Sequence, residues 1–201
     1  MFQFDSDLIL EDARVRLEPL QIGHLDALSP IAEGYPDLLR YSPSPFGSRE
    51  KLLDYFEDSW ASRKLQTRYP FAVFDKEKSA YAGSTSFANV SLYHQRLDVG
   101  YTWYAPPFQR SGLNRHCKFL LLRHAFEFLE MERVEFKIDS RNQASRTAVE
   151  KIGGQLEGTL RSHTLMADGY RRNTMVYSIL KSEWPDIRGR VFGGMLDLGL
   201  V

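Results

Sequence analysis

The chain lacks the features that mark several large classes of protein. It has one cysteine, Cys117, which excludes an internal disulfide and a metal cluster built on cysteines. It has no excess of charge, since 26 Lys and Arg residues match 26 Asp and Glu residues, whereas nucleic acids and anionic membranes favour basic partners. No apolar run approaches the roughly 20 residues that cross a bilayer, and no signal peptide is evident at the start. We therefore expect a cytoplasmic protein that binds no metal, nucleic acid or membrane.

The size and composition are typical of one globular domain. The 201 residues are 43% hydrophobic and 26% charged, which is ordinary for a chain that buries a sizeable core. We find no internal repeat, low-complexity tract or linker. The sequence predicts a single domain over residues 1–201, with a core from about 14 to 180 and a C-terminal extension over 181–201.

Hydrophobic periodicity predicts seven strands and four helices. The strands are expected at residues 14–20, 70–74, 80–90, 96–104, 133–139, 155–166 and 172–180. The helices are expected at 21–33, 48–66, 115–130 and 143–152. Helices come first, then a meander, one strand-helix-strand crossover and a closing hairpin. This order predicts an α/β fold (α+β by some schemes), with a mixed twisted sheet and helices on both faces.

The strand at 96–104 alternates along its whole length. Such alternation places every second residue on the same face. We expect Tyr101 and Trp103 in the core, and Tyr104 on the opposite face beside a possible site. The two predicted sets are Leu97, Val99, Tyr101 and Trp103 on the inner face, and Asp98, Gly100, Thr102 and Tyr104 on the other.

Two helix starts within residues 101–154 suit an anion. The turn from Gln109 to Asn114 leads from a strand into a helix and contains Gly112. Backbone N–H groups and the helix dipole make such a turn a phosphate site. The second helix starts at Asn142, a good cap, with the hydroxyl of Ser145 in its first turn. The pair predicts a phosphorylated cofactor.

Four motifs in order resemble one family. They are Asp98-Val99-Gly100-Tyr101, Gln109-Arg110-Ser111-Gly112-Leu113-Asn114, Asn142-x-x-Ser145 followed by Glu150-Lys151-Ile152-Gly153, and Asp168-Gly169-x-x-Arg172-Asn173 with Val176-Tyr177-Ser178. The sequence resembles the GNAT superfamily of acetyl-CoA-dependent N-acetyltransferases, and most of all its branch of ribosomal-protein alanine and serine N-terminal acetyltransferases. It departs from the family pattern in two places: Asp98 replaces a glutamate, and Asn114 replaces a small residue.

The resemblance implies where acetyl-CoA would bind. In this fold two adjacent parallel strands splay apart and the pantetheine arm of CoA enters between them. Here these are the strands that end at Tyr104 and start near Arg133, with the pyrophosphate on the Gly112 turn. The implied cofactor-binding residues are Tyr104, Gln109, Arg110, Ser111, Gly112, Leu113, Asn114, Arg115, Asn142 and Ser145.

Two residues are candidates for catalysis. Asp98 could take a proton from an attacking amine, directly or through water, or it could simply be a polar residue of the cleft. The resemblance places Ser145 by the CoA sulfur, although it could also serve only as a helix-start residue. The tyrosine acid of many GNAT enzymes is absent, because its position is Val149. His94 and His163 are alternative bases.

The expected reaction is direct attack of a primary amine on acetyl-CoA in a ternary complex. No acyl-enzyme is expected, because neither Ser145 nor Cys117 has a visible activating base. The acceptor, a protein N-terminus or a small amine, would enter beside Tyr35, Tyr41, Phe46, His163 and Arg172. A catalytically silent CoA-binding or regulatory module is the alternative.

The apolar tail after Trp184 has two interpretations. It either folds back on its own domain or packs against a second subunit in a homodimer.

Overall fold

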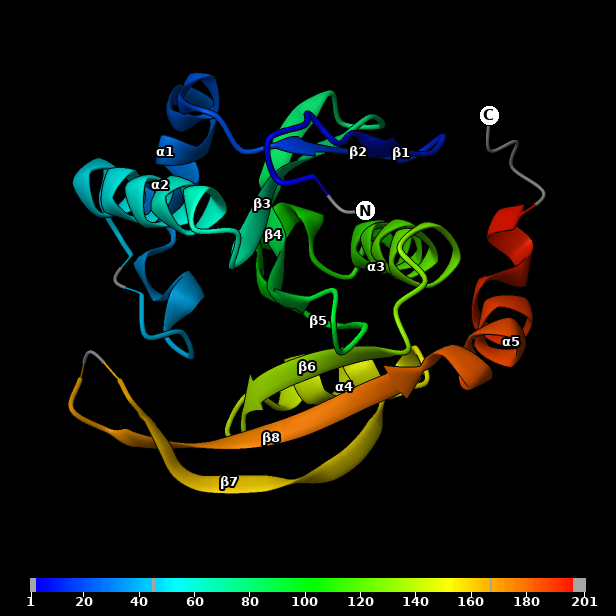
Figure 1. Cartoon of the computed structure of the whole chain (residues 1–201). Helices are drawn as coiled ribbons and strands as arrows, with labels where there is room; N and C mark the ends of the chain where they lie inside the picture. Colours follow the sequence, from blue (N-terminus) through cyan, green and yellow to red (C-terminus); the bar gives the residue numbers. More distant parts are fainter. Residues whose placement is uncertain (1–2, 45, 167, 197–201) are drawn as a thin grey trace.

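A mixed sheet organises the molecule (Figure 1), and the computed structural model describes residues 3–44, 46–166 and 168–196. The sheet has eight strands in the order β1-β2-β3-β4-β5-β6-β8-β7. The strands are β1 (Leu10–Glu11), β2 (Val15–Pro19), β3 (Arg68–Asp75), β4 (Ala80–Ser91), β5 (Arg96–Tyr104), β6 (Arg133–Asp139), β7 (Gln155–Leu165) and β8 (Arg171–Leu180). The mixed α/β sheet is confirmed, with one strand more than predicted. The extra strand, β1, is two residues long and so too short to show an alternation.

Helices cover both faces of the sheet, as predicted (Figure 1). One face carries α1 (Leu25–Gly34) and α2 (Arg49–Lys64). Their apolar residues form a cluster with Ala72 of β3, Trp103 of β5 and Ala105, which follows β5. The other face carries α3 (Leu113–Arg123), α4 (Gln143–Lys151) and α5 (Trp184–Leu196). A π-helical segment (His124–Phe128) extends α3. Short 3-10 turns link the elements at Ile22–His24, Pro36–Leu39, Pro106–Phe108 and Lys181–Glu183.

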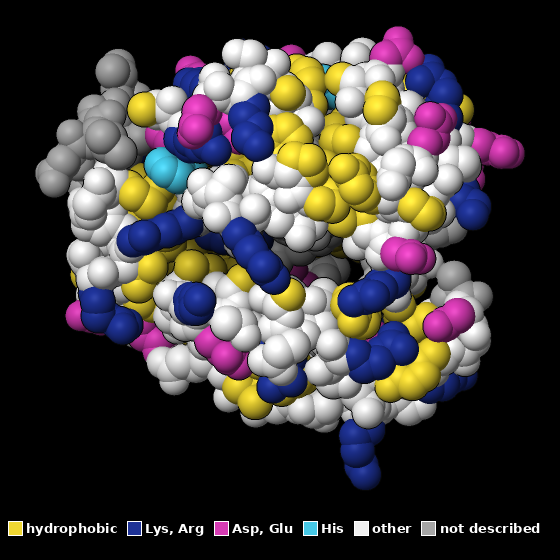
Figure 2. Space-filling model, turned by 180° about the vertical axis from the view of Figure 1, so that it is seen from behind, with side chains coloured by type: hydrophobic (Ala, Val, Ile, Leu, Met, Phe, Trp, Pro, Cys, Tyr) yellow, Lys and Arg dark blue, Asp and Glu magenta, His cyan; other side chains and the backbone are white. Residues whose placement is uncertain are grey.

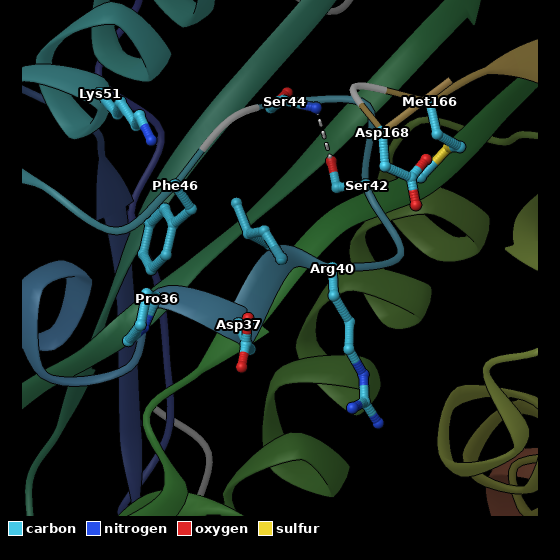
Figure 3. A pocket seen from close by; sticks show the side chains of 10 residues that line it. Pro36, Asp37, Arg40, Ser42, Ser44, Phe46, Lys51, Met166 and Asp168 are labelled. Atoms are coloured by element: carbon cyan, nitrogen blue, oxygen red, sulfur yellow. Dashed lines mark hydrogen bonds between the residues drawn. The ribbon is translucent and has the colours of Figure 1, made fainter. Parts of the chain in front are cut away.

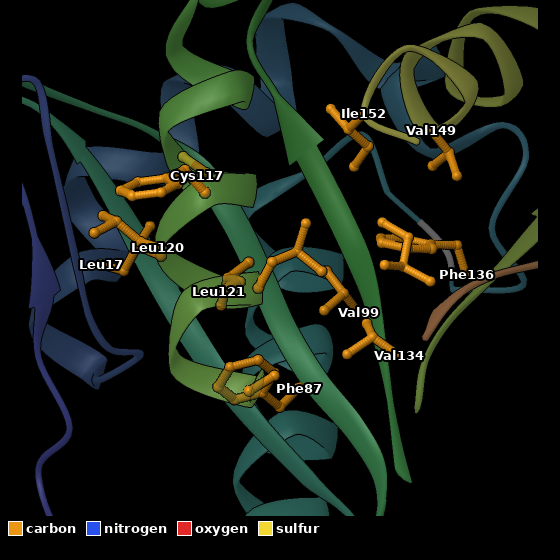
Figure 4. Close-up of a cluster of buried hydrophobic side chains, with 14 of the residues drawn as sticks. Leu17, Phe87, Val99, Cys117, Leu120, Leu121, Val134, Phe136, Val149 and Ile152 are labelled. Atoms are coloured by element: carbon orange, nitrogen blue, oxygen red, sulfur yellow. The ribbon is translucent and has the colours of Figure 1, made fainter. Parts of the chain in front are cut away.

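The larger core lies between the sheet and α3 and α4 (Figure 4). Leu121 of α3 is fully buried, and so are Phe87 of β4 and Val134 of β6. Val149 and Ile152 bring α4 into the same cluster. Burying one such side chain stabilises the fold by about 1.5–3 kcal/mol. This core fixes α3 and α4 to the strands whose ends they follow.

Strands β5 and β6 are parallel, and they pair only at their beginnings. The paired rows are Arg96 with Arg133, Leu97 with Val134, and Asp98 with Glu135. Beyond them β5 stays paired with β4 as far as Tyr104, and β6 stays paired with β8 as far as Asp139. Each strand follows its antiparallel neighbour, so the two diverge. The predicted splay of the central pair is confirmed.

A bulge in β5 corrects the predicted faces of that strand. Gly100 pairs with Ser86 and Trp103 with Ser84, so Tyr101 and Thr102 lie opposite the single residue Thr85. Tyr101 has a φ of +51° and its side chain is 47% exposed, so it is not a core residue. Past the bulge the alternation changes phase. Trp103 therefore packs on the α1–α2 side, while Tyr104 joins Leu97 and Val99 in the core under α3.

The C-terminal extension forms α5, which periodicity did not predict. Trp184 and Phe192 are buried and pack against Phe119 of α3, with ring centroids 6.3 and 5.3 Å away. Ile187 and Met195 lie in the same core cluster. Over the described residues the tail therefore folds back on its own domain. Residues 197–201 lie outside the described part of the chain.

Replacing Phe192 with alanine should destabilise the protein by about 3–5 kcal/mol, because it leaves a cavity between α5 and α3. Urea unfolding followed by circular dichroism measures this. Arg190→Ala is the matched control, since its ion pair with Asp186 is exposed and should contribute under about 1 kcal/mol. Equal stability of the two variants would contradict the packing of α5.

Candidate active site

The turn before α3 is held in an open shape by its own side chains. Gln109 Nε2 donates to the carbonyl of Tyr104 at 2.8 Å, and the hydroxyl of Ser111 donates to the carbonyl of Phe108 at 2.7 Å. Gly112 begins the helix with a φ of +89°, and a Cβ built on it would meet no atom within 4 Å. Glycine adopts this conformation without a steric cost. The turn therefore presents its backbone to open space, as a phosphate site requires.

The two arginines of this turn differ in their surroundings. Arg110 is exposed, and no partner for its guanidinium is found among the described residues. The guanidinium of Arg115 donates to the carbonyl of Val191 in α5, and its backbone N–H donates to the carbonyl of Gly112 at 2.9 Å. Both groups of Arg115 are thus already engaged within the protein.

Three more residues that were predicted to bind the cofactor are partly or wholly buried in the protein. Leu113 is fully buried, so only its backbone can face a ligand. Asn114 has a buried Oδ1 with no partner among the described atoms. Tyr104 is buried beside Cys117, and this burial and the neighbouring thiol raise the pKa of Tyr104 well above its usual value. Burial also raises the pKa of the Cys117 thiol to about 12, so the thiol is protonated at neutral pH.

Asp98 lies where β5 and β6 begin to separate. It is the last β5 residue paired with β6, and only 5% of it is exposed. Its Oδ2 accepts hydrogen bonds from Asn89 Nδ2 and Lys137 Nζ, both at 2.7 Å. Its Oδ1 is buried and has no partner in the described structure. One oxygen is therefore held by two hydrogen bonds, while the other has none.

A row of charges along β6 supports Asp98. Lys137 also lies 3.2 Å from Glu135, which is paired in turn with Arg133 at 2.9 Å. Burial opposes the charge on Lys137, but its hydrogen bonds to Asp98 and Glu135 outweigh this effect and raise its pKa. The cation thus remains protonated and neutralises the buried carboxylate.

Asn142 and Ser145 occupy the places predicted for them at the start of α4. The side chain of Asn142 caps the helix by accepting the backbone N–H of Ser145 at 3.1 Å. Ser145 is partly exposed, and its hydroxyl has no hydrogen-bond partner among the described residues. Val149 points into the core and is 4% exposed.

A cavity of about 290 Å³ lies between the predicted acceptor segments (Figure 3). Phe46 lines it and packs on Trp103 with ring centroids 5.2 Å apart. Met166 and Asp168 line it from the β7–β8 hairpin. The remaining lining residues come from the loop before α2 and its first turn, and include Asp37, Arg40 and Lys51. The 35–46 loop and the hairpin thus border one cavity.

Arg172 ties the hairpin to its surroundings. Its guanidinium donates to the carbonyls of Tyr41 at 3.3 Å and Lys137 at 3.4 Å, and burial lowers the pKa of Arg172. His163 lies in β7 with Nδ1 3.1 Å from Thr174 Oγ1. Tyr35 is 38% exposed and precedes the Pro36–Leu39 turn. Of the predicted acceptor residues, Tyr41 and Arg172 contact each other and only Phe46 lines the cavity.

Sequence reasoning missed several polar residues of this region. Asn89 and Lys137 hold Asp98, and Arg141 stacks on Tyr170 at 3.7 Å from the ring centre. Asn89 has a φ of +48° where the β4–β5 pairing is irregular between Ala88 and Ser91, a conformation that asparagine tolerates. No spacing in the sequence distinguishes these residues from surface polar ones.

The space-filling view shows the region from behind (Figure 2). A hollow crosses the middle of this face, at the height at which β5 and β6 separate in Figure 1, and Lys and Arg side chains lie along its edges. Within the described ranges, no group of His, Cys, Asp and Glu residues forms a metal site. None of the helices in these ranges is long and apolar enough to cross a membrane.

Comparison with known proteins agrees with this geometry. The family model described as an acetyltransferase (GNAT) domain matches residues 14–155, which is most of the chain. The chain belongs to the GNAT acetyltransferase family. A solved structure of a candidate acetyltransferase is 35% identical to this GNAT protein, with a TM-score of 0.84 over 95% of this chain and 94% of that one. Another, from T. thermophilus, is 34% identical, with a TM-score of 0.86 over 97% of this chain and 100% of that one.

A curated relative bears a name from the predicted branch. YdaF of Bacillus subtilis (strain 168), named as a candidate ribosomal N-acetyltransferase, is 33% identical over 102 residues. The match covers 51% of this GNAT chain and 55% of YdaF, so it spans little more than half of that relative.

Replacing Lys137 with methionine should destabilise the protein by about 1–3 kcal/mol, because it leaves the buried carboxylate of Asp98 without its cation. Urea unfolding measures the loss. Adding Asp98→Asn should restore part of it, since the buried charge is then removed as well. If the double variant lost the sum of the two single effects, the two residues would not be coupled.

Proposed function

We propose that this GNAT protein binds acetyl-CoA between β5 and β6 and transfers the acetyl group to a primary amine. The observation that carries the proposal is the divergence of β5 and β6 after Asp98 and Glu135, together with the open turn at Gly112 that follows the end of β5. Peptide groups of the separated segments need hydrogen-bond partners, and the amides of a pantetheine arm are of the right chemistry. The site residues thus fit the co-substrate that the family uses.

Different residues would bind the two substrates. The Gly112 turn and the exposed Arg110 would hold the phosphates, and Ser145 would lie near the thioester. The acceptor amine would come from the cavity lined by Phe46 and Met166. Such positioning of two reactants makes an otherwise bimolecular step effectively unimolecular, which lowers the barrier.

Proton transfer would fall to Asp98. Its free Oδ1 can take a proton from the amine, directly or through one water, while Lys137 and Asn89 keep Oδ2 in place. The Cys117 thiol is buried and protonated, so it does not offer a nucleophile. Ser145 lacks an adjacent base among the described side chains. Direct attack is therefore the mechanism that these residues support.

Binding tests the proposal first. Calorimetry should show that CoA binds the wild type, and that Gly112→Val weakens it about tenfold or more, because valine tolerates a positive φ poorly and crowds the phosphate. Gly158→Val is the control, since Gly158 is also open but has no positive φ. A wild type that binds no CoA would overturn the proposed function.

Turnover tests the acceptor and the roles of Asp98 and Ser145. Release of CoA thiol should occur with a peptide N-terminus or a small amine as acceptor, whereas a silent binding module would release none. Asp98→Asn should lower the rate by about 10²–10⁴-fold, most of all at low pH where free amine is scarce. Its affinity for CoA should stay within about twofold. An unchanged pH profile would remove Asp98 from the mechanism.

Ser145→Ala separately tests whether Ser145 helps to protonate the leaving thiolate of CoA. A loss of about tenfold to a thousandfold in turnover is expected if the hydroxyl helps to protonate the leaving thiolate. The helix itself should remain, because Asn142 and not Ser145 supplies the capping side chain. A variant with the wild-type rate would leave Ser145 as a helix-start residue only.

A further inference from the structure

Lys118 is a buried lysine in the middle of α3. Only 6% of the residue is exposed, although the charged end of a lysine normally reaches water. Its neighbours along the helix, Cys117 and Phe119, are fully buried in the core. A lysine in this position is not explained by the packing of the helix.

The ammonium of Lys118 lies between the two diverging strands. Nζ is 3.3 Å from Thr102 Oγ1 of β5 and 5.6 Å from the ring centre of Phe136 of β6. Both residues come after the last paired row, Asp98 with Glu135. The cation therefore occupies the start of the gap on the α3 side of the sheet.

The protein itself compensates this charge poorly. The single hydrogen bond is long, and Thr102 Oγ1 is also shared with Thr85 at 2.7 Å. No ion pair of Lys118 occurs among the described residues, and burial lowers its pKa to about 8. Lys137, across the sheet, has two carboxylates. A buried cation without a counter-charge costs stability, so its presence points to a partner from outside the protein.

We propose that the ammonium of Lys118 donates hydrogen bonds to carbonyl oxygens of an extended amide arm lying between β5 and β6. Given the proposed function, on which this inference rests, that arm is the pantetheine of CoA. Lys118 is six residues beyond Gly112, or about 9 Å along the helix. It is therefore too far down α3 to bind the phosphates at the turn, and it meets the arm that follows them.

Two ligands separate this role from general binding. One is CoA, and the other is adenosine 3′-phosphate 5′-diphosphate, which is CoA without its pantetheine arm. Calorimetry should show that Lys118→Met weakens the binding of CoA by about 10–100-fold, which is the affinity that a hydrogen bond to a charged group contributes. The affinity for the nucleotide should stay within about twofold. Lys64→Met, at the exposed end of α2, should change neither.

Thermal unfolding without ligand supplies an independent readout. Lys118→Met should melt at the wild-type temperature or higher, because methionine fills a similar volume without a buried charge. If Lys118 had a purely structural role, the Lys118→Met variant would have a lower melting temperature than the wild type.

The outcomes are distinct. If Lys118→Met binds CoA as tightly as the wild type, or if its affinities for both ligands fall by the same factor, Lys118 does not contact the pantetheine arm. If the wild type binds CoA no more tightly than the nucleotide, the arm makes no useful contact and the inference also fails. If the wild type binds neither ligand, the proposed function itself is wrong.

Discussion

The structure depends on a conflict of pairing in the middle of the sheet. β5 is bound to β4 along its length and β6 is bound to β8 along its length, and these two antiparallel pairs take different directions after three shared rows. Because each strand already satisfies one edge in an antiparallel ladder, closing the gap would require breaking one of those ladders. The gap is thus a stable consequence of the fold, and the unpaired peptide groups along it are available for a ligand.

The helices on the α3 face are positioned by this arrangement. β5 ends at Tyr104, just before Pro106-Pro107, which cannot continue a strand, and the chain turns at Gly112 into α3. β6 ends at Asp139, and Asn142 starts α4 three residues later. Both helices that begin at this end of the gap are fixed by the core around Leu121 and Val149. The starts of α3 and α4 are therefore held close to the ends of β5 and β6.

The charges on the two sides of the gap are unequal. On the side of Asp98 the protein balances its own buried charges, with Lys137 between two carboxylates. On the side of α3 the ammonium of Lys118 has, among the described residues, one hydrogen-bond partner, the hydroxyl of Thr102, and no carboxylate. A low dielectric makes unpaired charge expensive, so we infer that a ligand balances the second side, whereas the protein itself balances the first. This asymmetry matches a site that receives a polar arm from one side and a neutral amine from the other.

The sequence by itself determined the elements whose signals are local. Strands 96–104 and 133–139 were predicted to the residue, and alternation and the two prolines delimit the first of them. The turn at Gly112 and the cap at Asn142 involve contacts within five residues, so a short segment suffices to specify them. The motifs were enough to identify the family and its splayed pair.

Only the tertiary structure decided the features that involve neighbours distant in the chain. The bulge at Tyr101 arises from the register with β4, so simple alternation placed Tyr101 on the wrong face. The partners of Asp98 come from β4 and β6, and the burial of Lys118 depends on where α3 crosses the gap. The packing of α5 on α3 likewise needs both helices in place. Periodicity reports which face of one element is apolar, but it cannot report what that face meets.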